Sequence, residues 1–537
     1  MRDDIPFVGK HVDAYNLDAW RRHLGADTDP AALVAELAEG TLPHAFRAGG
    51  SRDPRRTALV IDDRAVTHEE VGERALRAAG WLRARDVRPG DRVMLCAPNS
   101  LELVVAYLGV LGAGAIAVPA GTALQEPELR HIAHDSGAVL ACAGGEAVGR
   151  LRRIAEDHRS LRQVVELTPE GGLDGEPLAP PGLVGGAVAV LAYTSGTTGR
   201  PKGVPLTHAN LLSSMRAVLR AWRWTPDDVL VHALPLSHQH GLGGIHAALM
   251  SGSRAVVHSH FDAARLCAAI EAERATVLFA VPAVYQRLLE WDGIGDADLS
   301  TLRLAVSGSA PLPAGLGRRI SERLEQVPVE RYGTTESGLN VSNPYDGPRL
   351  LGSVGLPLPG TELAIVDAAR ETVPAGDVGE IALRGPQVFS GYWKLPEATR
   401  ESFLPGGWYL TGDLGRIDGE NGYLTITGRS RELIISGGLN VYPAEVESVL
   451  GDHPGVREVA VVGVPSERWG EEVVAFVVPS SGAAPSSAEL VRHAKGYLAA
   501  YKCPKRVTFV DALPRSEVGK VLRDALLEQD RGGRRRL

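Results

Sequence analysis

Apolar and polar positions along the chain predict sheets layered with helices. Short apolar runs typical of buried strands fall at residues 91–97, 115–118, 187–191, 229–236, 276–281 and 302–306. Apolar residues recur at helical spacing in 75–82, which follows the capping-box sequence Thr67-His-Glu-Glu70, and in 101–111. Strands that alternate with helices are typical of an α/β fold with helices on the faces of a sheet. We therefore expect a large α/β domain.

One stretch, residues 193–208, indicates phosphate chemistry. It reads YTSGTTGRPKGVPLTH and follows the apolar run 187–191. Its hydroxyls and glycines precede Lys202 and are Thr194, Ser195, Gly196, Thr197, Thr198 and Gly199. Glycines expose consecutive backbone N–H groups to an anion, hydroxyls add donors, and a lysine adds a point charge. The pattern predicts a strand, a glycine-rich turn, and a helix that begins after Thr207 as its N-cap.

Composition narrows the class of protein. The chain has 537 residues, too many for one core, and a net charge of −8 with both signs mixed, which argues against a nucleic-acid binder. Its four cysteines lie far apart, so neither a disulfide framework nor a zinc site is indicated. The apolar run 103–120 is broken by glycines and Pro119, which favours a buried helix and strand over a membrane span. We expect a cytoplasmic protein with no membrane partner and leave its oligomeric state open.

The phosphate stretch closely resembles the signature of the adenylate-forming superfamily, which includes acyl-CoA synthetases, luciferases and peptide-synthetase adenylation domains. It differs from a P-loop, because Gly203 follows Lys202. RYGTTESG (331–338), WYLTGDLGRID (408–418) and LPRSEVGKVLR (513–523) resemble further motifs of that superfamily. The resemblance covers about residues 42–530. It implies ATP and Mg²⁺ as cofactors and CoA as the acceptor.

The resemblance also implies domains. We expect an N-terminal extension of unknown role at 1–41, which we interpret as an extra helical arm. An AMP-binding domain at 42–429 and a small, mobile α+β lid domain at 430–537 follow. Arg431 falls at the hinge, and Gly437, Gly438 and Lys502 fall on the lid surface that serves CoA.

The resemblance assigns roles to individual residues. Lys520, Lys202 and Glu336 are the catalytic candidates, and Glu336 with Thr194 would bind the metal. Asp413 would accept hydrogen bonds from the ribose hydroxyls, with Arg429 beside it. The rest of the predicted nucleotide site comprises the turn residues Ser309, Ala310 and Pro311 and, from the 331–338 motif, Tyr332, Gly333 and Thr335. From the residues alone, Glu336 fits a helix N-terminus equally well, and Lys520 fits a solvated loop.

Within residues 277–367 the resemblance narrows to malonyl-CoA synthetases, which hold a second carboxylate with an arginine. Arg287 is our candidate, against an Arg287–Glu290 pair on a helix face, and Arg349 is a weaker one. The predicted acid pocket comprises His238, Gln239, Arg287, Ser307, Gly308 and Thr334. Gln239 and Thr334 depart from the malonate pattern, because they add an amide and a hydroxyl. We expect a small polar, malonate-like carboxylic acid.

Other functions stay open. The acid could be aryl, or another oxyanion such as nitrite, and the acceptor could be a carrier-protein thiol or an amine. A kinase or P-loop ATPase would release ADP or phosphate instead of AMP and pyrophosphate. Six histidines between His232 and His260 suggest a metal cluster, but no carboxylate or thiol stands at ligand spacing. Pocket and surface histidines are the favoured interpretation.

Overall fold

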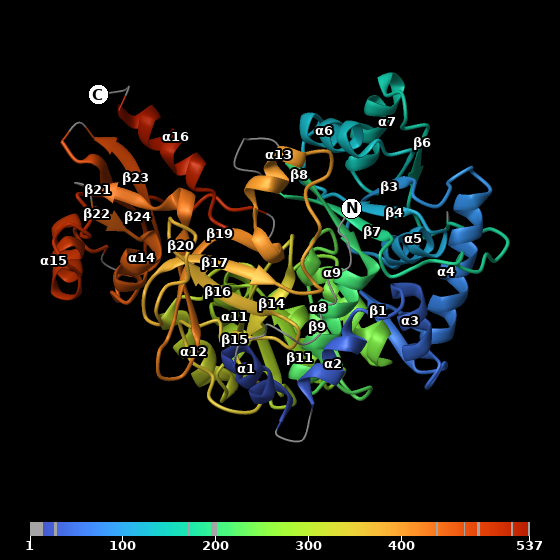
Figure 1. Ribbon diagram of the computed structural model, residues 1–537, viewed down its shortest axis with the longest axis horizontal. Coiled ribbons are helices and arrows are strands. Elements are labelled where there is room, and N and C mark those ends of the chain that lie inside the picture. The colour runs from blue at the N-terminus through green and yellow to red at the C-terminus, as the bar shows by residue number, and fades with distance from the viewer. Residues whose placement is uncertain are drawn as a thin grey trace.

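Two lobes of unequal size make up the protein (Figure 1). The computed structural model describes residues 14–25, 29–169, 172–194, 201–436, 439–466, 468–480, 484–516 and 519–534. The small lobe is the C-terminal part, drawn in orange and red at the left of Figure 1. The predicted fold class, with a large layered N-terminal domain and a small C-terminal domain, is confirmed.

Two sheets form the main body of the large lobe. The first runs in the order β15 (Leu356–Pro357), β14 (Gly338–Ser342), β13 (Val329–Thr334), β12 (Leu304–Ser307), β11 (Val277–Ala280), β9 (Val229–His232), β10 (Arg254–Val257), β1 (Thr57–Ile61), β2 (Arg64–Thr67). The second runs β6 (Gln163–Glu166), β5 (Leu140–Ala143), β3 (Arg92–Cys96), β4 (Ile116–Pro119), β7 (Val188–Thr194), β8 (Lys202–Thr207). Parallel neighbours from β9 to β13 bring the ends of several strands, and the loops after them, to one edge.

Helices cover both faces of these sheets, as the alternating pattern predicts. Those of the large lobe are α1 (Ala14–Leu24), α2 (Pro30–Leu37), α3 (Leu42–Gly50), α4 (His68–Arg83), α5 (Leu101–Gly112), α6 (Glu126–Ser136), α7 (Ala147–Asp157), α8 (His208–Ala221), α9 (Gln239–Ser251), α10 (Ala263–Ala272), α11 (Pro282–Leu289), α12 (Ala314–Leu324) and α13 (Pro396–Glu401). Leu266 of α10, Leu288 of α11 and Ile320 of α12 form one apolar cluster with strand residues of the first sheet. Burial of such faces supplies most of the favourable free energy of folding.

A third sheet completes the large lobe, and a fourth forms the small one. The third runs β16 (Glu362–Val366), β17 (Gly379–Arg384), β19 (Trp408–Ile417), β18 (Phe403–Leu404), with β20 (Leu424–Arg429) paired to β19. The fourth runs β22 (Leu439–Val441), β21 (Ile434–Ser436), β24 (Gly470–Pro479), β23 (Val456–Ser466), with β25 (Arg506–Phe509) paired to β24. The small-lobe helices are α14 (Pro443–Gly451), α15 (Ser487–Tyr497) and α16 (Arg523–Arg534), and short 3-10 turns are η1 (Asp292–Gly295), η2 (Pro405–Gly407) and η3 (Ser430–Glu432). The boundary at 429/430 stays a prediction; η3 lies between β20 and β21.

Two local sequence patterns form the elements that they predict. Thr67 caps α4 with the predicted reciprocal box to Glu70. The run 103–120 forms α5 and β4, and a Cβ on Gly109 would lie 2.5 Å from the Cβ of Ala78, so α4 and α5 pack closely there. In the described part of the chain, no helix is both long and apolar enough to cross a bilayer.

The phosphate stretch differs from its prediction in one element. The expected helix does begin at His208, with Thr207 as its N-cap. However, β8 comes directly before the helix and pairs antiparallel with β7, so that Thr194 faces Lys202. Gly203 and Pro205 conceal this strand in the sequence; a proline is tolerated because β8 is an edge strand.

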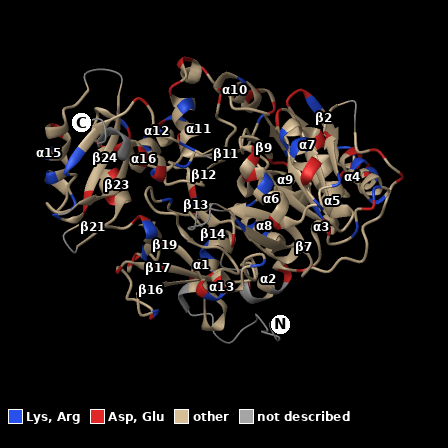
Figure 2. Cartoon of the chain, turned by 90° about the horizontal axis from the view of Figure 1, so that it is seen from above, with Lys and Arg blue, Asp and Glu red and all other residues tan. Residues whose placement is uncertain are grey.

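The described N-terminal residues are helical, as expected, but they are embedded rather than projecting. The indole N–H of Trp20 donates to the carbonyl of Thr361 at 3.0 Å, and Trp20 is 2% exposed. A ring nitrogen of His23 lies 3.1 Å from the carbonyl of Leu356. Helix α1 therefore packs on the large lobe. Figure 2 shows Lys and Arg interspersed with Asp and Glu over both lobes.

Candidate active site

The carboxylate of Asp413 lies at the centre of the predicted ribose-binding part of the site. It is 5% exposed on β19 and faces Arg429 on β20, whose Nε lies 3.1 Å from its Oδ1. The hydroxyl of Tyr332 donates to its Oδ2 at 2.7 Å. The charge of Asp413 raises the pKa of Arg429. Two donors thus fix the Asp413 carboxylate, and the predicted nucleotide residues Tyr332, Asp413 and Arg429 meet.

Tyr392, which the sequence did not predict, lies between the metal candidate Glu336 and the phosphate candidate Lys202. The hydroxyl of Tyr392 donates to Oε1 of Glu336 at 3.1 Å, and Glu336 is 9% exposed. The Nζ of Lys202 lies 5.0 Å from the centre of the Tyr392 ring. Lys202 pairs with Thr194 across β7 and β8. Lys202 and Glu336 therefore both lie beside Tyr392, and Thr194 lies opposite Lys202 on the neighbouring strand.

These oxygen donors fit magnesium. Mg²⁺ prefers oxygen ligands and usually takes one or two carboxylates together with waters and substrate phosphates. Glu336 supplies a buried carboxylate and Thr194 a hydroxyl at the end of β7. The described residues hold no group of three or more His, Cys, Asp and Glu side chains at metal distance. The donor set suits a metal that is completed by nucleotide oxygens.

Lys520, from the small lobe, lies near the same carboxylates. Neighbouring Gly519 has φ +76°, and a Cβ on it would lie 3.3 Å from the Cβ of Ala283 in α11. Burial lowers the pKa of Lys520, and Arg429 lowers it further, whereas Asp413 and Glu336 raise it. Part of the side chain stays exposed, which limits this desolvation. The lysine therefore lies within electrostatic reach of the predicted ribose and metal carboxylates.

Apart from Arg287 on α11, the predicted acid-pocket residues lie at the ends of β12 and β13 and at the start of α9. Ser307 is fully buried at the end of β12, with Gly308 after it. The side-chain amide of Gln239 donates to the carbonyl of Thr335 at 2.9 Å, and the hydroxyls of Thr334 and Ser337 are 2.8 Å apart. His238 is the N-cap of α9. Gln239 thus ties α9 to the 331–338 segment.

The predicted purine turn follows β12 directly. Ser309 has φ +69°, a left-handed conformation that is uncommon for a non-glycine residue. Its hydroxyl lies 3.3 Å from Nδ1 of His240. Ala310 is half-buried and Pro311 is exposed.

Comparison with known proteins decides the family. The family model described as AMP-binding enzyme matches residues 46–393, and that of the AMP-binding enzyme C-terminal domain matches residues 445–520. The chain belongs to the AMP-binding enzyme family. It is an AMP-forming acid–CoA ligase, and ligases of this kind use ATP, Mg²⁺ and CoA.

Individual relatives of this AMP-binding enzyme differ in their acids. A feruloyl-CoA synthase of Amycolatopsis sp is 40% identical over 88% of this chain and 95% of its own length. The mitochondrial malonate–CoA ligase ACSF3 of Mus musculus is 34% identical over 95% and 94%. MatB of Rhodopseudomonas palustris, 38% identical over 91% and 99%, superimposes with a TM-score of 0.86 in its ATP-bound structure and 0.77 in its apo structure.

Arg287 lies on α11 in an exposed position. Its guanidinium carbon is 4.5 Å from the centre of the Phe261 ring, a cation–π distance. The alternative pair with Glu290 is not seen among the described residues, where Glu290 accepts from Gln286 instead. Arg349 donates to the carbonyl of Val327 at 2.8 Å, so its guanidinium is already bound to the backbone of the large lobe. The acid-binding role of Arg287 stays a prediction.

The hinge and CoA candidates are spread over the small lobe. Arg431 is exposed in η3, and its charge lowers the pKa of Lys520. Lys502 pairs with Glu445 at 2.6 Å rather than pointing to the cleft candidates described above. The predicted residues outside the described part of the chain are Ser195, Gly196, Thr197, Thr198, Gly199, Gly437 and Gly438.

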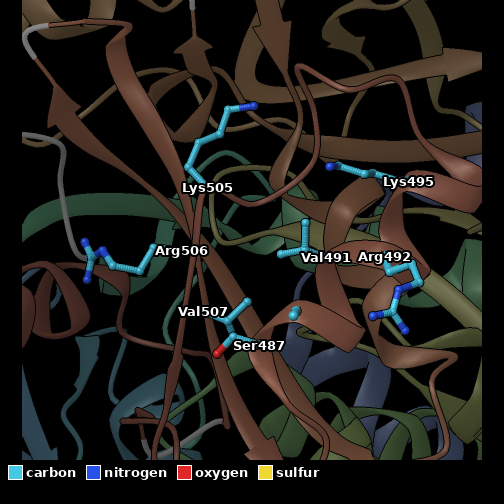
Figure 3. Close-up of a pocket in the computed structure, with 8 residues that line it drawn as sticks. Ser487, Val491, Arg492, Lys495, Lys505, Arg506 and Val507 are labelled. Carbon is cyan, nitrogen blue, oxygen red and sulfur yellow. The ribbon is translucent and has the colours of Figure 1, made fainter.

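A basic groove on the small lobe contains none of the predicted site residues. Its lining comes from α15, from β25 and from the residue before β25, and includes Arg492, Lys495, Lys505 and Arg506. Figure 3 shows Arg506 pointing away from Arg492 and Lys495. Arg506 is already paired with Asp530 and Glu472. The groove therefore adds nothing to the site in the cleft.

Buried Glu330 gives a prediction about stability and pH. Burial raises the pKa of its carboxyl to about 8, although the backbone N–H of Leu312 opposes this by donating to it. In the unfolded chain the pKa is about 4.3, so the folded state binds the extra proton between these values. The contribution of Glu330 to the free energy of unfolding is therefore fully present below about pH 4.3. It is lost progressively as the pH rises from there through about 8.

The isosteric Glu330→Gln variant, which cannot ionise, should therefore gain Tm relative to the wild type as pH rises from 5.5 to 8.5. The free energy of unfolding of the variant, relative to that of the wild type, should rise by up to about 1.4 kcal/mol per pH unit within that window. Thermal unfolding of both proteins at several pH values measures it. Parallel Tm curves would contradict the proposed neutral carboxyl.

Proposed function

We propose that the enzyme activates a small polar, malonate-like carboxylic acid as its acyl-AMP and transfers the acyl group to CoA. The observation that carries this is the approach of Lys520, from the small lobe, to Asp413 and Glu336 of the large lobe. That arrangement supports Lys520 as the cation that would meet the α-phosphate of a nucleotide held by both carboxylates. The roles of the site residues below are part of the proposal.

In the first step, a carboxylate oxygen of the acid attacks the α-phosphorus of ATP, and pyrophosphate leaves. Negative charge builds on the α-phosphate oxygens, so fixed cations and donors aimed there lower the barrier. Lys520 would bind that phosphate, Lys202 the departing phosphates, and Asp413 the ribose. Bound Mg²⁺, held by Glu336 and Thr194, would neutralise phosphate charge.

In the second step, the CoA thiol attacks the acyl carbon and AMP leaves with the oxygen that came from the acid. Lys520 would then obstruct the thiol, so the small lobe has to turn about Arg431 and present Gly437 and Gly438. The higher similarity to ATP-bound MatB than to its apo structure supports an adenylating orientation of the lobes here.

Two observations support a dicarboxylic acid. The chain is similar to a malonate–CoA ligase over almost its whole length. Arg287, in the last turn of α11, carries an exposed guanidinium that suits a second carboxylate. Gln239 is already engaged with Thr335, so it would limit the depth of the pocket instead of binding the acid strongly.

A second candidate is an aryl acid. The feruloyl-CoA synthase relative is more identical in sequence than the malonate–CoA ligase. Thr334 is smaller than the methionine that malonyl-CoA synthetases usually have there, and so would leave room for a ring. A carrier-protein thiol or an amine as the acceptor would belong to this alternative.

A pyrophosphate-release screen over mono-, di- and aryl carboxylates, with and without CoA, tests the proposal. We expect the highest kcat/KM for a short dicarboxylate, with AMP and an acyl-CoA as products. Preference for hydroxycinnamates would favour the aryl candidate. Release of ADP, or AMP formation that never yields a thioester with CoA, would refute the proposed reaction.

A further inference from the structure

One segment of the third sheet's connections, residues 386–394, is fixed to both of the other sheets of the large lobe. It follows β17, and the backbone N–H of Phe389 donates to the carbonyl of Glu336, between β13 and β14, at 2.8 Å. The backbone N–H of Trp393 donates to the carbonyl of Gly203, on β8, at 2.8 Å. The segment therefore joins the part of the first sheet that carries the metal candidate to the strand that carries the phosphate lysine.

Tyr392 lies between these two anchored positions and contacts both charged side chains. Its hydroxyl donates to Oε1 of Glu336 at 3.1 Å, and the Nζ of Lys202 lies 5.0 Å from the centre of its ring. That separation is within the range of a cation–π interaction. Burial raises the pKa of Tyr392, and the charge of Glu336 raises it further, so the hydroxyl keeps its proton and remains a donor. One side chain thus binds the carboxylate through its hydroxyl and the ammonium through its ring.

The tyrosine is itself held in place by other residues. Its ring meets the fully buried ring of Phe389 edge-on, with the centroids 4.9 Å apart and the planes at 72°. Its backbone N–H donates to the hydroxyl of Thr399, in α13, at 2.9 Å. The position of Tyr392 therefore does not depend on the two charged side chains that it contacts.

Lys202 and Glu336 carry opposite charges beside one tyrosine, yet they do not pair with each other. In the part of the chain that the structure describes, no ion pair is seen for either side chain. An ammonium and a carboxylate attract each other. A pair between them would have to break before the ammonium could meet a phosphate or the carboxylate a metal ion.

We propose that Tyr392 is a positioning residue, which holds the Glu336 carboxylate for Mg²⁺ and the Lys202 ammonium for the phosphates of ATP and keeps the two charges apart. This inference rests on the proposed function, which gives those two roles to Glu336 and Lys202. A hydrogen bond to a ligating carboxylate orients it, and loss of such a bond typically lowers metal affinity by about 10- to 100-fold. The ring supplies the second contact, which a phenylalanine would keep and a leucine would lose.

The two contacts can be separated by measuring ATP binding without turnover. Titration calorimetry in the absence of an acid gives the dissociation constant of ATP with Mg²⁺ and with EDTA, and the ratio of the two is the gain from magnesium. For Tyr392→Phe, which loses only the hydroxyl, we expect this gain to fall about 10-fold. Its affinity for ATP in EDTA should stay within about twofold of the wild type, whereas that of Tyr392→Leu, which also loses the ring, should fall about fivefold.

Tyr423→Phe provides a matched control, because the buried hydroxyl of Tyr423 donates to the backbone carbonyl of Pro348 at 2.6 Å and not to a charged side chain. It should leave both dissociation constants unchanged. A double-mutant cycle serves if Tyr392→Leu does not fold. In a Glu336→Gln background, Tyr392→Phe should change the gain from magnesium less than about twofold, because the hydroxyl acts through that carboxylate.

An unchanged gain from magnesium in Tyr392→Phe, or an equal loss in Tyr423→Phe, overturns the inference. Full additivity of Tyr392→Phe and Glu336→Gln also overturns it, and an unchanged affinity of Tyr392→Leu for ATP in EDTA overturns the role toward Lys202. These results leave acid activation intact as long as the wild type forms AMP. A wild type that forms no AMP with any acid overturns the proposed function. One that forms AMP but binds ATP equally well with Mg²⁺ and with EDTA overturns only the metal role of Glu336 and the inference with it.

Discussion

Lys520→Ala should abolish formation of the acyl-adenylate while sparing thioester formation from supplied acyl-AMP. Loss of a cation aimed at the charge that develops in the transition state costs roughly 10²–10³-fold in rate. The second half-reaction needs the small lobe in another orientation, where Lys520 has no part. ATP–pyrophosphate exchange measures the first half-reaction, and CoA consumption with synthetic acyl-AMP measures the second.

Lys495→Ala provides the control for this variant, since Lys495 lies on α15 in the basic groove. It removes the same charge from the same lobe and should leave both half-reactions unchanged. Equal loss of both half-reactions in Lys520→Ala would contradict the assigned role, because it would indicate damage to the lobe as a whole.

Glu336→Gln should lower the rate of pyrophosphate release by about 100-fold and raise the Mg²⁺ concentration required for half-maximal rate. The amide keeps the shape of the carboxylate and can still accept the hydroxyl of Tyr392, so folding should be preserved. A magnesium titration of pyrophosphate release, with Tm alongside it, measures both effects.

The exposed carboxylate of Glu371 offers a matched control for that titration. Glu371→Gln removes one negative charge outside the cleft and should leave both the rate and the magnesium requirement unchanged. If Glu336→Gln kept the wild-type magnesium requirement, Glu336 would not be a metal ligand.

Short-range signals in the sequence were reliable guides to this fold. The box at Thr67 and Glu70 and the cap at Thr207 each involve residues within one helical turn, so the chain shows both partners together. Strand β8 was missed because Gly203 and Pro205 are poor strand formers, and its pairing with β7 is a tertiary contact. Tertiary pairing of this kind leaves no periodic pattern.

In the site, too, the sequence predicts individual residues but not the long-range contacts between them. Motifs identify Asp413, Glu336 and Lys520 by resemblance, but the hydrogen bond from Tyr332 to Asp413 spans 81 residues, and that from Tyr392 to Glu336 spans 56. Nothing in spacing predicts such contacts.

The central claim is that the oxygen of the acid becomes bonded to the α-phosphorus of ATP. Turnover of an acid labelled with ¹⁸O in its carboxylate, followed by mass spectrometry of the AMP, tests this directly. We predict that each AMP molecule carries one ¹⁸O from the acid, because thiol attack breaks the bond between the acyl carbon and that oxygen. AMP free of the label, or label found in inorganic phosphate with ADP as the product, would contradict the account.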